Sequence, residues 1–109
     1  MRKIFSAAVA AIVLFSGPAS AWDGVLTGTV VGIEVVASGG TSHNMDFRVY
    51  VSGTAKCNGN GWAYIDSNAT NYNAIVATIL SAKVTKSPIS VYANKDSAGY
   101  CLIGDVSVS

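Results

Sequence analysis

The alternation of apolar and polar positions is most regular between Met45 and Gly53. The apolar face of this segment consists of Met45, Phe47, Val49 and Val51. A period of two residues predicts a β-strand that is half-buried. The face expected outside the core consists of Asp46, Arg48, Tyr50 and Ser52.

The segment Val25–Ala37 is the second strong β pattern. It is rich in β-branched residues, contains Gly28 and Gly32, and is partly apolar on both faces. This composition predicts one long strand that bends at a glycine. Apolar side chains on both faces are expected of a strand shared between two layers of a small barrel.

Three shorter strands and one helix are predicted further along the chain. Two Asn-Gly steps at 58–61 indicate a turn, and strands are expected over Trp62–Ile65, Ile89–Ala93 and Tyr100–Val108. Helical spacing predicts an amphipathic helix over Asn71–Val84, and its apolar positions are Tyr72, Ile75, Val76, Ile79 and Leu80. Residues suited to N-capping fill 66–71, and Pro88 prevents continuation.

The predicted order is strand, strand, strand, helix, strand, strand. A mainly β (α+β) fold with five strands and a helix between the third and fourth is the order of the oligonucleotide/oligosaccharide-binding (OB) barrel. Closure would also remove exposed strand edges. The alternative is an open α+β sheet with the helix packed on one face.

The segment Met1–Ala21 has the pattern of a bacterial export signal. Arg2 and Lys3 precede an apolar run, and Ala19-Ser20-Ala21 forms a small-x-small cleavage site. The run is short for a membrane span, and no second one follows. We therefore expect a secreted or periplasmic protein whose mature chain, Trp22–Ser109, is a single OB-like domain without a membrane span.

Cys57 and Cys101 are the only cysteines. In an oxidising compartment such a pair predicts one disulfide; two free buried thiols are the alternative. No metal site is expected, because His43 is the only histidine and no CxxC or HxxxH spacing occurs.

Charge disfavours nucleic acid and anionic membranes as partners. Without Arg2 and Lys3, five basic side chains stand against six acidic ones, which gives a formal net charge of −1. Such a chain has no basic field with which to hold a phosphate backbone.

The sequence contains no recognisable catalytic set. Any serine or threonine nucleophile would need His43 as its base, and His43 lies beside a Gly/Ser-rich loop. The aspartates form no close pair in sequence that resembles a general acid and base, and no phosphate-binding glycine loop is present. We expect no enzyme activity and no cofactor; an exported hydrolase is the alternative that would require His43.

Aromatic residues are numerous for a chain of this length, and they comprise Trp22, Tyr50, Tyr64, Tyr72, Tyr92 and Tyr100 among others. Tyr50 falls on the polar face of its strand, so its ring is expected outside the core. Exposed rings beside hydroxyls and amides suit neutral sugars, because a ring stacks on the C–H face of a sugar. Rings that cover the barrel ends or a subunit contact are the alternative.

Three stretches resemble the B subunits of the pertussis-like toxins, such as the subtilase cytotoxin B subunit. They are the opening strand 22–30 (WDGVLTGTV), the helix that starts at Tyr72-Asn73 with the strand segment 85–92 (TKSPISVY), and the last strand segment 102–107 (LIGDVS). Together they cover roughly half of the mature chain.

This resemblance implies an OB barrel that assembles as a ring pentamer and binds sialylated host glycans. It places Thr27 at the position of the glycan-binding serine, Asp23 at a nearby acidic contact and Tyr92 in the pocket. The chain departs from the family at Ala93, where the subtilase subunit has a second tyrosine, and in having only two cysteines.

The sequence thus predicts an exported, non-enzymatic protein that binds a glycan. A periplasmic structural, accessory or inhibitor protein that contacts only protein is the alternative.

Overall fold

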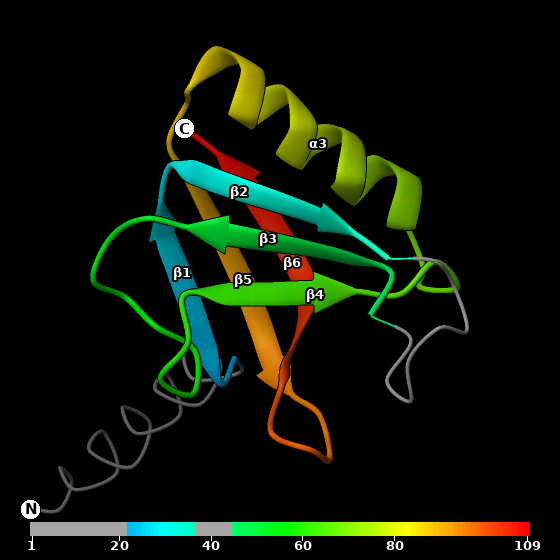
Figure 1. Cartoon of the computed structure of the whole chain (residues 1–109). Helices are drawn as coiled ribbons and strands as arrows, with labels where there is room; N and C mark the ends of the chain where they lie inside the picture. Colours follow the sequence, from blue (N-terminus) through cyan, green and yellow to red (C-terminus); the bar gives the residue numbers. More distant parts are fainter. Residues whose placement is uncertain (1–21, 37–44) are drawn as a thin grey trace, which may run out of the picture.

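The computed structural model describes residues 22–36 and 45–109. The predicted export signal and His43 lie outside the described residues. The described residues form six strands and one helix (Figure 1), in the order β1 (Gly24–Gly28), β2 (Val30–Val35), β3 (Phe47–Val51), β4 (Trp62–Ile65), α3 (Tyr72–Thr85), β5 (Ile89–Lys95) and β6 (Cys101–Val108).

All six strands belong to one mixed sheet with the order β1-β5-β6-β4-β3-β2. Every pairing is antiparallel except that of β4 with β6, which are joined in parallel at Tyr64 and Leu102. The prediction of a mainly β fold with one helix after the Trp62–Ile65 strand is confirmed. No ladder joins the outer strands β1 and β2, so the sheet is not closed into a barrel.

The predicted bend at a glycine is found at Gly28, but the prediction of one continuous strand over Val25–Ala37 is wrong. Two strands occupy this segment, and they separate at Thr29. Gly28 has φ +152°, and a Cβ at this position would lie 2.1 Å from the carbonyl oxygen of Ser52. The chain therefore turns at Gly28, because β3 passes directly against it, and its two parts pair with different strands: β1 with β5 and β2 with β3.

Hydrogen bonds hold this corner in place. The backbone N–H of Thr29 donates to Oγ of Ser52 (3.1 Å), and the backbone N–H of Ser52 donates to the carbonyl oxygen of Thr29 (2.9 Å). A Cβ on Gly53 would also lie 2.3 Å from the carbonyl oxygen of Thr27. Two backbones meet here at a distance that glycine alone permits.

The strands form two groups that cross each other. Figure 1 shows β2, β3 and β4 in front of β1, β5 and β6. The two groups are joined by the β4–β6 pair and by the chain at Thr29. Side chains from both groups form one hydrophobic core, which includes Leu26, Val30, Phe47, Val49, Val51, Ala63, Ile65, Ile89, Val91, Ala93 and Ile103.

The alternation predicted for the second strand is confirmed, with one exception. Phe47, Val49 and Val51 are buried, whereas Arg48 and Tyr50 are partly exposed. Asp46, which was expected outside, is buried. Its Oδ2 accepts a hydrogen bond from the backbone N–H of Ser67 (2.6 Å), so this carboxylate ties the start of β3 to the turn that precedes the helix.

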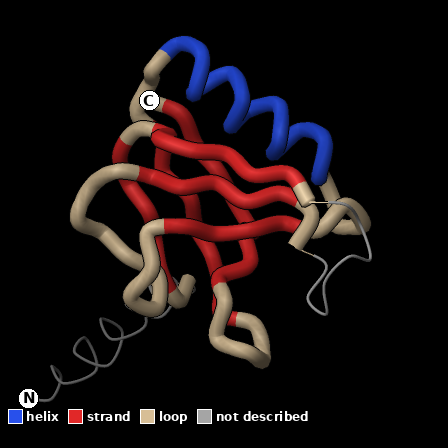
Figure 2. Tube along the Cα trace, in the orientation of Figure 1, coloured by secondary structure: helices blue, strands red, loops and turns tan. Residues whose placement is uncertain are grey.

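The helix packs against β6 and β2, and Figure 2 shows it along one side of the sheet. Its predicted start and end are each within one residue of the observed ones. Ile79 and Ala82 are fully buried, whereas Leu80, which was expected on the buried face, is 44% exposed. Asn71 adopts a left-handed conformation and makes no side-chain capping bond. The polar residues before the helix therefore form a turn, in which the N–H of Ala69 donates to the carbonyl oxygen of Asp66.

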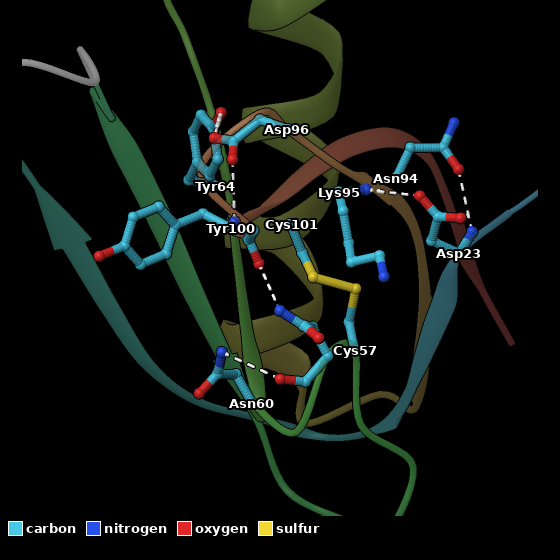
Figure 3. The surroundings of a disulfide bond; sticks show 11 residues. Asp23, Cys57, Asn60, Tyr64, Asn94, Lys95, Asp96, Tyr100 and Cys101 are labelled. Atoms are coloured by element: carbon cyan, nitrogen blue, oxygen red, sulfur yellow. Dashed lines mark hydrogen bonds between the residues drawn. A yellow bond between two sulfur atoms is a disulfide. The ribbon is translucent and has the colours of Figure 1, made fainter.

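The disulfide between Cys57 and Cys101 is confirmed, and Figure 3 shows its surroundings. Both residues are buried, with their Cα atoms 6.4 Å apart. The bridge joins the β3–β4 connection to the first residue of β6. A Cβ on Gly24 would lie 2.8 Å from Cys57, so the first residue of β1 packs directly on the bridge.

Removal of the bridge is expected to destabilise the fold strongly. The cysteines are 44 residues apart, and closing a loop of that size in the unfolded chain corresponds to about 4 kcal/mol in the chain-entropy model. The double variant Cys57→Ala/Cys101→Ala should lose about this much unfolding free energy in urea. A loss below about 1 kcal/mol, or free thiols in the unreduced denatured wild type, would contradict the assignment.

Gly28→Ala is expected to lose about 3 kcal/mol of stability, because the new methyl group overlaps the Ser52 carbonyl. Gly32→Ala is the matched control. A Cβ at Gly32 would lie 3.5 Å from the Tyr50 ring, an ordinary contact, so its effect should stay below about 1 kcal/mol. Thermal unfolding of both variants measures the difference, and equal losses would show that the corner at Gly28 is not tightly packed.

Candidate functional site

Two of the three residues predicted to bind a ligand share an outward face of the sheet. Thr27 pairs with Ser90, and Tyr92 pairs with Val25, in the β1–β5 ladder. Thr27 is exposed and Tyr92 is partly exposed, whereas Leu26 and Val91 between them are buried. Thr27 and Tyr92 are therefore neighbouring outward positions on adjacent strands.

Trp22 adds a second ring to this face. Its ring centroid lies 6.0 Å from that of Tyr92. A Cβ on Gly104 would lie 2.5 Å from the Trp22 ring, so the indole packs directly against a position where β6 has no side chain. We call Trp22, Thr27 and Tyr92 the Trp22 surface.

Asp23, the third predicted residue, makes hydrogen bonds to the end of β5. Its Oδ2 accepts a hydrogen bond from the N–H of Lys95 (2.7 Å), and its own N–H donates to Oδ1 of Asn94 (2.9 Å). Figure 3 shows these two bonds as a reciprocal clamp between the start of β1 and the end of β5. Asp23 therefore positions Trp22, the residue before it.

A cleft of about 210 Å³ adjoins the Trp22 surface at Gly104. One wall comes from the first half of α3 and the other from β6, and the lining residues are Asn71, Ala74, Ile75, Thr78, Gly104, Asp105 and Val106. Polar side chains at Asn71, Thr78 and Asp105 give this cleft hydrogen-bonding groups, and the Trp22 ring lies at its edge beside Gly104.

A second aromatic surface lies on β3 and β4. Tyr50 and Trp62 are cross-strand partners with ring centroids 6.2 Å apart. The ring centroid of Tyr100, which directly precedes β6, lies 5.7 Å from that of Trp62. The sequence indicated that Tyr50 points outward but did not reveal this row, because the row depends on the pairing register and on the path of the β5–β6 loop.

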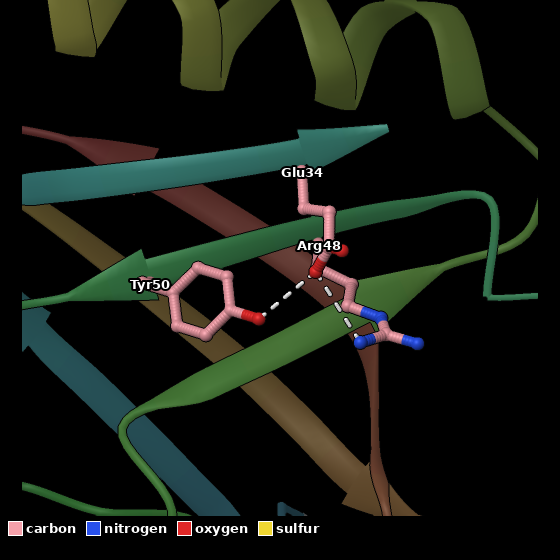
Figure 4. A network of polar contacts seen from close by, with 3 residues as sticks. All are labelled: Glu34, Arg48 and Tyr50. Atoms are coloured by element: carbon pink, nitrogen blue, oxygen red, sulfur yellow. Dashed lines mark hydrogen bonds and ion pairs between the residues drawn. The ribbon is translucent and has the colours of Figure 1, made fainter. Parts of the chain in front are cut away.

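A charged pair lies beside Tyr50, as Figure 4 shows. Nη1 of Arg48 and the hydroxyl of Tyr50 both donate to Oε1 of Glu34, at 3.3 and 3.1 Å. The Arg48 guanidinium also lies over the Trp62 ring, 5.4 Å from its centroid, which is a cation–π geometry. We call Glu34, Arg48, Tyr50, Trp62 and Tyr100 the Trp62 surface.

The two remaining tyrosines pack toward the interior of the protein. Tyr64 is buried and donates to Oδ2 of Asp96 (2.6 Å), and Tyr72 packs against the core. Burial, followed by the hydrogen bond to Asp96, raises the pKa of Tyr64 well above its ordinary value.

Carboxylates that are distant in sequence influence each other electrostatically in the fold. Burial raises the pKa of Asp66, and the negative charges of Asp46 and Asp96 raise it further. Within 22–36 and 45–109, no group of three or more histidine, cysteine or carboxylate side chains is arranged to hold a metal ion. The described part of the chain also has no helix long and apolar enough to cross a membrane.

No protein family, curated protein or solved structure was found to match this chain.

The raised pKa of Asp66 has a defined effect on stability. A carboxyl that binds its proton more tightly in the folded than in the unfolded state stabilises the fold while protonated, and this contribution is lost as the pH rises through its folded pKa. Asp66→Asn should therefore melt at a higher temperature than the wild type at pH 7. The difference should vanish below about pH 4, where the unfolded carboxyl is also protonated. A variant less stable at pH 7, or a pH-independent difference, would contradict this.

Proposed function

We propose that this protein is an exported, non-enzymatic glycan-binding domain of the OB type, and that the Trp22 surface binds the glycan. The observation that carries the proposal is the pair of rings at Trp22 and Tyr92 on the outward face that also presents the Thr27 hydroxyl. A ring that packs on a sugar beside a hydroxyl that takes its polar groups is the usual chemistry of carbohydrate recognition.

The strand order supports an OB assignment. If β1 and β2 are counted as one strand bent at Thr29, the order runs from this strand through β3, β4, β6 and β5 and back to the first strand. The helix then lies between the third and fourth strands, as expected for that fold. Because β1 and β2 are consecutive parts of the chain, the bend at Thr29 connects the two outer strands where no ladder joins them.

The disulfide supports export. Structural disulfides persist in oxidising compartments and are rare in the cytosol of most organisms. A bridge buried in the core agrees with the export signal expected from the sequence. The proposed location is the periplasm or the extracellular medium.

At Ala93 the chain lacks the second tyrosine of the subtilase subunit, and the structure shows what this position does instead. Ala93 is fully buried, so this position contributes no wall to an outward pocket. In our proposal Trp22 supplies the second ring beside Tyr92 instead. Sialylated glycans remain the proposed ligand class, because the resemblance to the toxin B subunits implies them and the Thr27 hydroxyl can donate to a carboxylate.

A glycan array with the purified mature protein tests the proposal. We expect sialylated glycans to bind, and we expect Thr27→Ala and Tyr92→Ala each to weaken binding about tenfold, equivalent to about 1.4 kcal/mol. Thr54→Ala, an exposed threonine in the β3–β4 connection, is the control and should bind normally. Asp23 is unsuitable as a test because its loss would also break the backbone clamp. No binding to any sialylated glycan would refute the proposal.

A second candidate function is protein contact alone, as a structural or accessory subunit or as an inhibitor. Exposed valines on neighbouring elements favour it: Val31 and Val35 on β2 are 60% and 73% exposed, and Val84 on α3 is 80% exposed. The molar mass in solution separates the cases. A pentamer favours the toxin-like assembly, whereas a monomer that binds no glycan favours a role that depends on a different protein.

A further inference from the structure

We propose that the Trp62 surface is a second carbohydrate-binding site, specific for neutral saccharides and independent of the Trp22 surface. It rests on the Tyr50–Trp62–Tyr100 row and the Glu34–Arg48 pair, none of which the proposed function uses. The two surfaces lie on different strands: β2, β3 and β4 carry most of the Trp62 surface, whereas β1 and β5 carry the Trp22 surface.

The three rings together can contact more than one sugar unit. Successive centroids are separated by 6.2 and 5.7 Å, with interplanar angles of 38° and 35°. These separations are comparable with the length of one pyranose unit. All three rings are partly exposed on the outward side of the sheet. Three rings that are neither in the core nor fully in solvent form a surface that a partner with C–H faces can cover.

Gly32 keeps one side of this row open. It is the β2 partner of Tyr50, and a Cβ at this position would lie 3.5 Å from the Tyr50 ring. Any larger side chain there would extend along the phenol. With glycine in this place, the Tyr50 ring is not covered by a cross-strand neighbour on the β2 side.

The charged pair supplies directed hydrogen bonds at the edge of the row. Oε1 of Glu34 accepts from both Arg48 and Tyr50, whereas Oε2 accepts from none of the described residues. Arg48 uses only Nη1 among the described residues, and Nε is buried without a partner. Figure 4 shows the second terminal nitrogen of Arg48 pointing away from Glu34. A donor and an acceptor are thus held side by side, as neighbouring sugar hydroxyls require.

The same pair selects against charged ligands. Arg48 and Glu34 form an ion pair, so their charges cancel at the site. A charged ligand is attracted by one member of the pair and repelled by the other, so it gains little net Coulomb energy at this site. A neutral sugar meets neither repulsion, because each hydroxyl can donate to the carboxylate or accept from the guanidinium.

The two tryptophans of the chain allow the sites to be observed separately, because each surface contains one of them. In a ¹H–¹⁵N spectrum of the full mature protein, the two indole N–H signals are assigned with the variants Trp22→Phe and Trp62→Phe. The protein is then titrated with maltotriose, cellotriose and lactose, and separately with 3′-sialyllactose. We expect at least one neutral saccharide to shift the Trp62 signal and to leave the Trp22 signal unchanged.

Variants in the row complete the test. Tyr50→Ala and Tyr100→Ala should each weaken the neutral saccharide about tenfold, and Tyr92→Ala, on the other surface, should leave it unchanged. Glu34→Ala should weaken it while the spectrum stays that of a folded protein. The proposal is overturned if no neutral saccharide in this panel shifts the Trp62 signal at millimolar concentration, or if Tyr92→Ala weakens binding as much as Tyr50→Ala. The response of Trp22 to 3′-sialyllactose reports on the proposed function independently of this outcome.

Discussion

The close approach of two backbones at Gly28 and Ser52 is the constraint on which the rest of the structure depends. Glycine at position 28 allows the first strand to turn against Ser52, where no side chain would fit. The two parts of the strand then pair with β5 and with β3. Leu26 on one side of the turn and Val30 on the other both reach the same core. Without the turn, one group of strands would lose its outer partner.

The disulfide acts where the two groups of strands are otherwise weakly joined. Apart from the turn at Thr29, the sheet is continuous between them only through the short β4–β6 pair at Tyr64 and Leu102. Cys101 directly precedes Leu102, so the bridge to Cys57 reinforces this pair. The bridge and the turn at Thr29 thus fix both junctions between the two groups of strands.

Local patterns were sufficient for several elements of this fold. Alternation located β3, helical spacing located α3 to within a residue at each end, and cysteine usage predicted the bridge. A bend at a glycine was predicted, whereas the division into two strands at Thr29 was not, since it depends on the close approach of Ser52, a residue 23 positions away. The row at Trp62 depends on strand register for the same reason. Thr27 and Tyr92, which the resemblance named, lie on one face of the sheet, whereas the backbone clamp made by Asp23 depends on Lys95, far along the chain.

The most direct test of the central claim is a set of interstrand nuclear Overhauser effects, recorded for the mature protein in solution. The structure requires cross-strand contacts from β1 to β5, such as Leu26 to Val91, and from β2 to β3, such as Ile33 to Val49, within one molecule. It also requires contacts between Thr29 and Ser52 at the turn. Both ladders together with the Thr29–Ser52 contacts are the predicted result. One uninterrupted ladder along residues 24–35 to a single partner strand, without those contacts, would contradict the account.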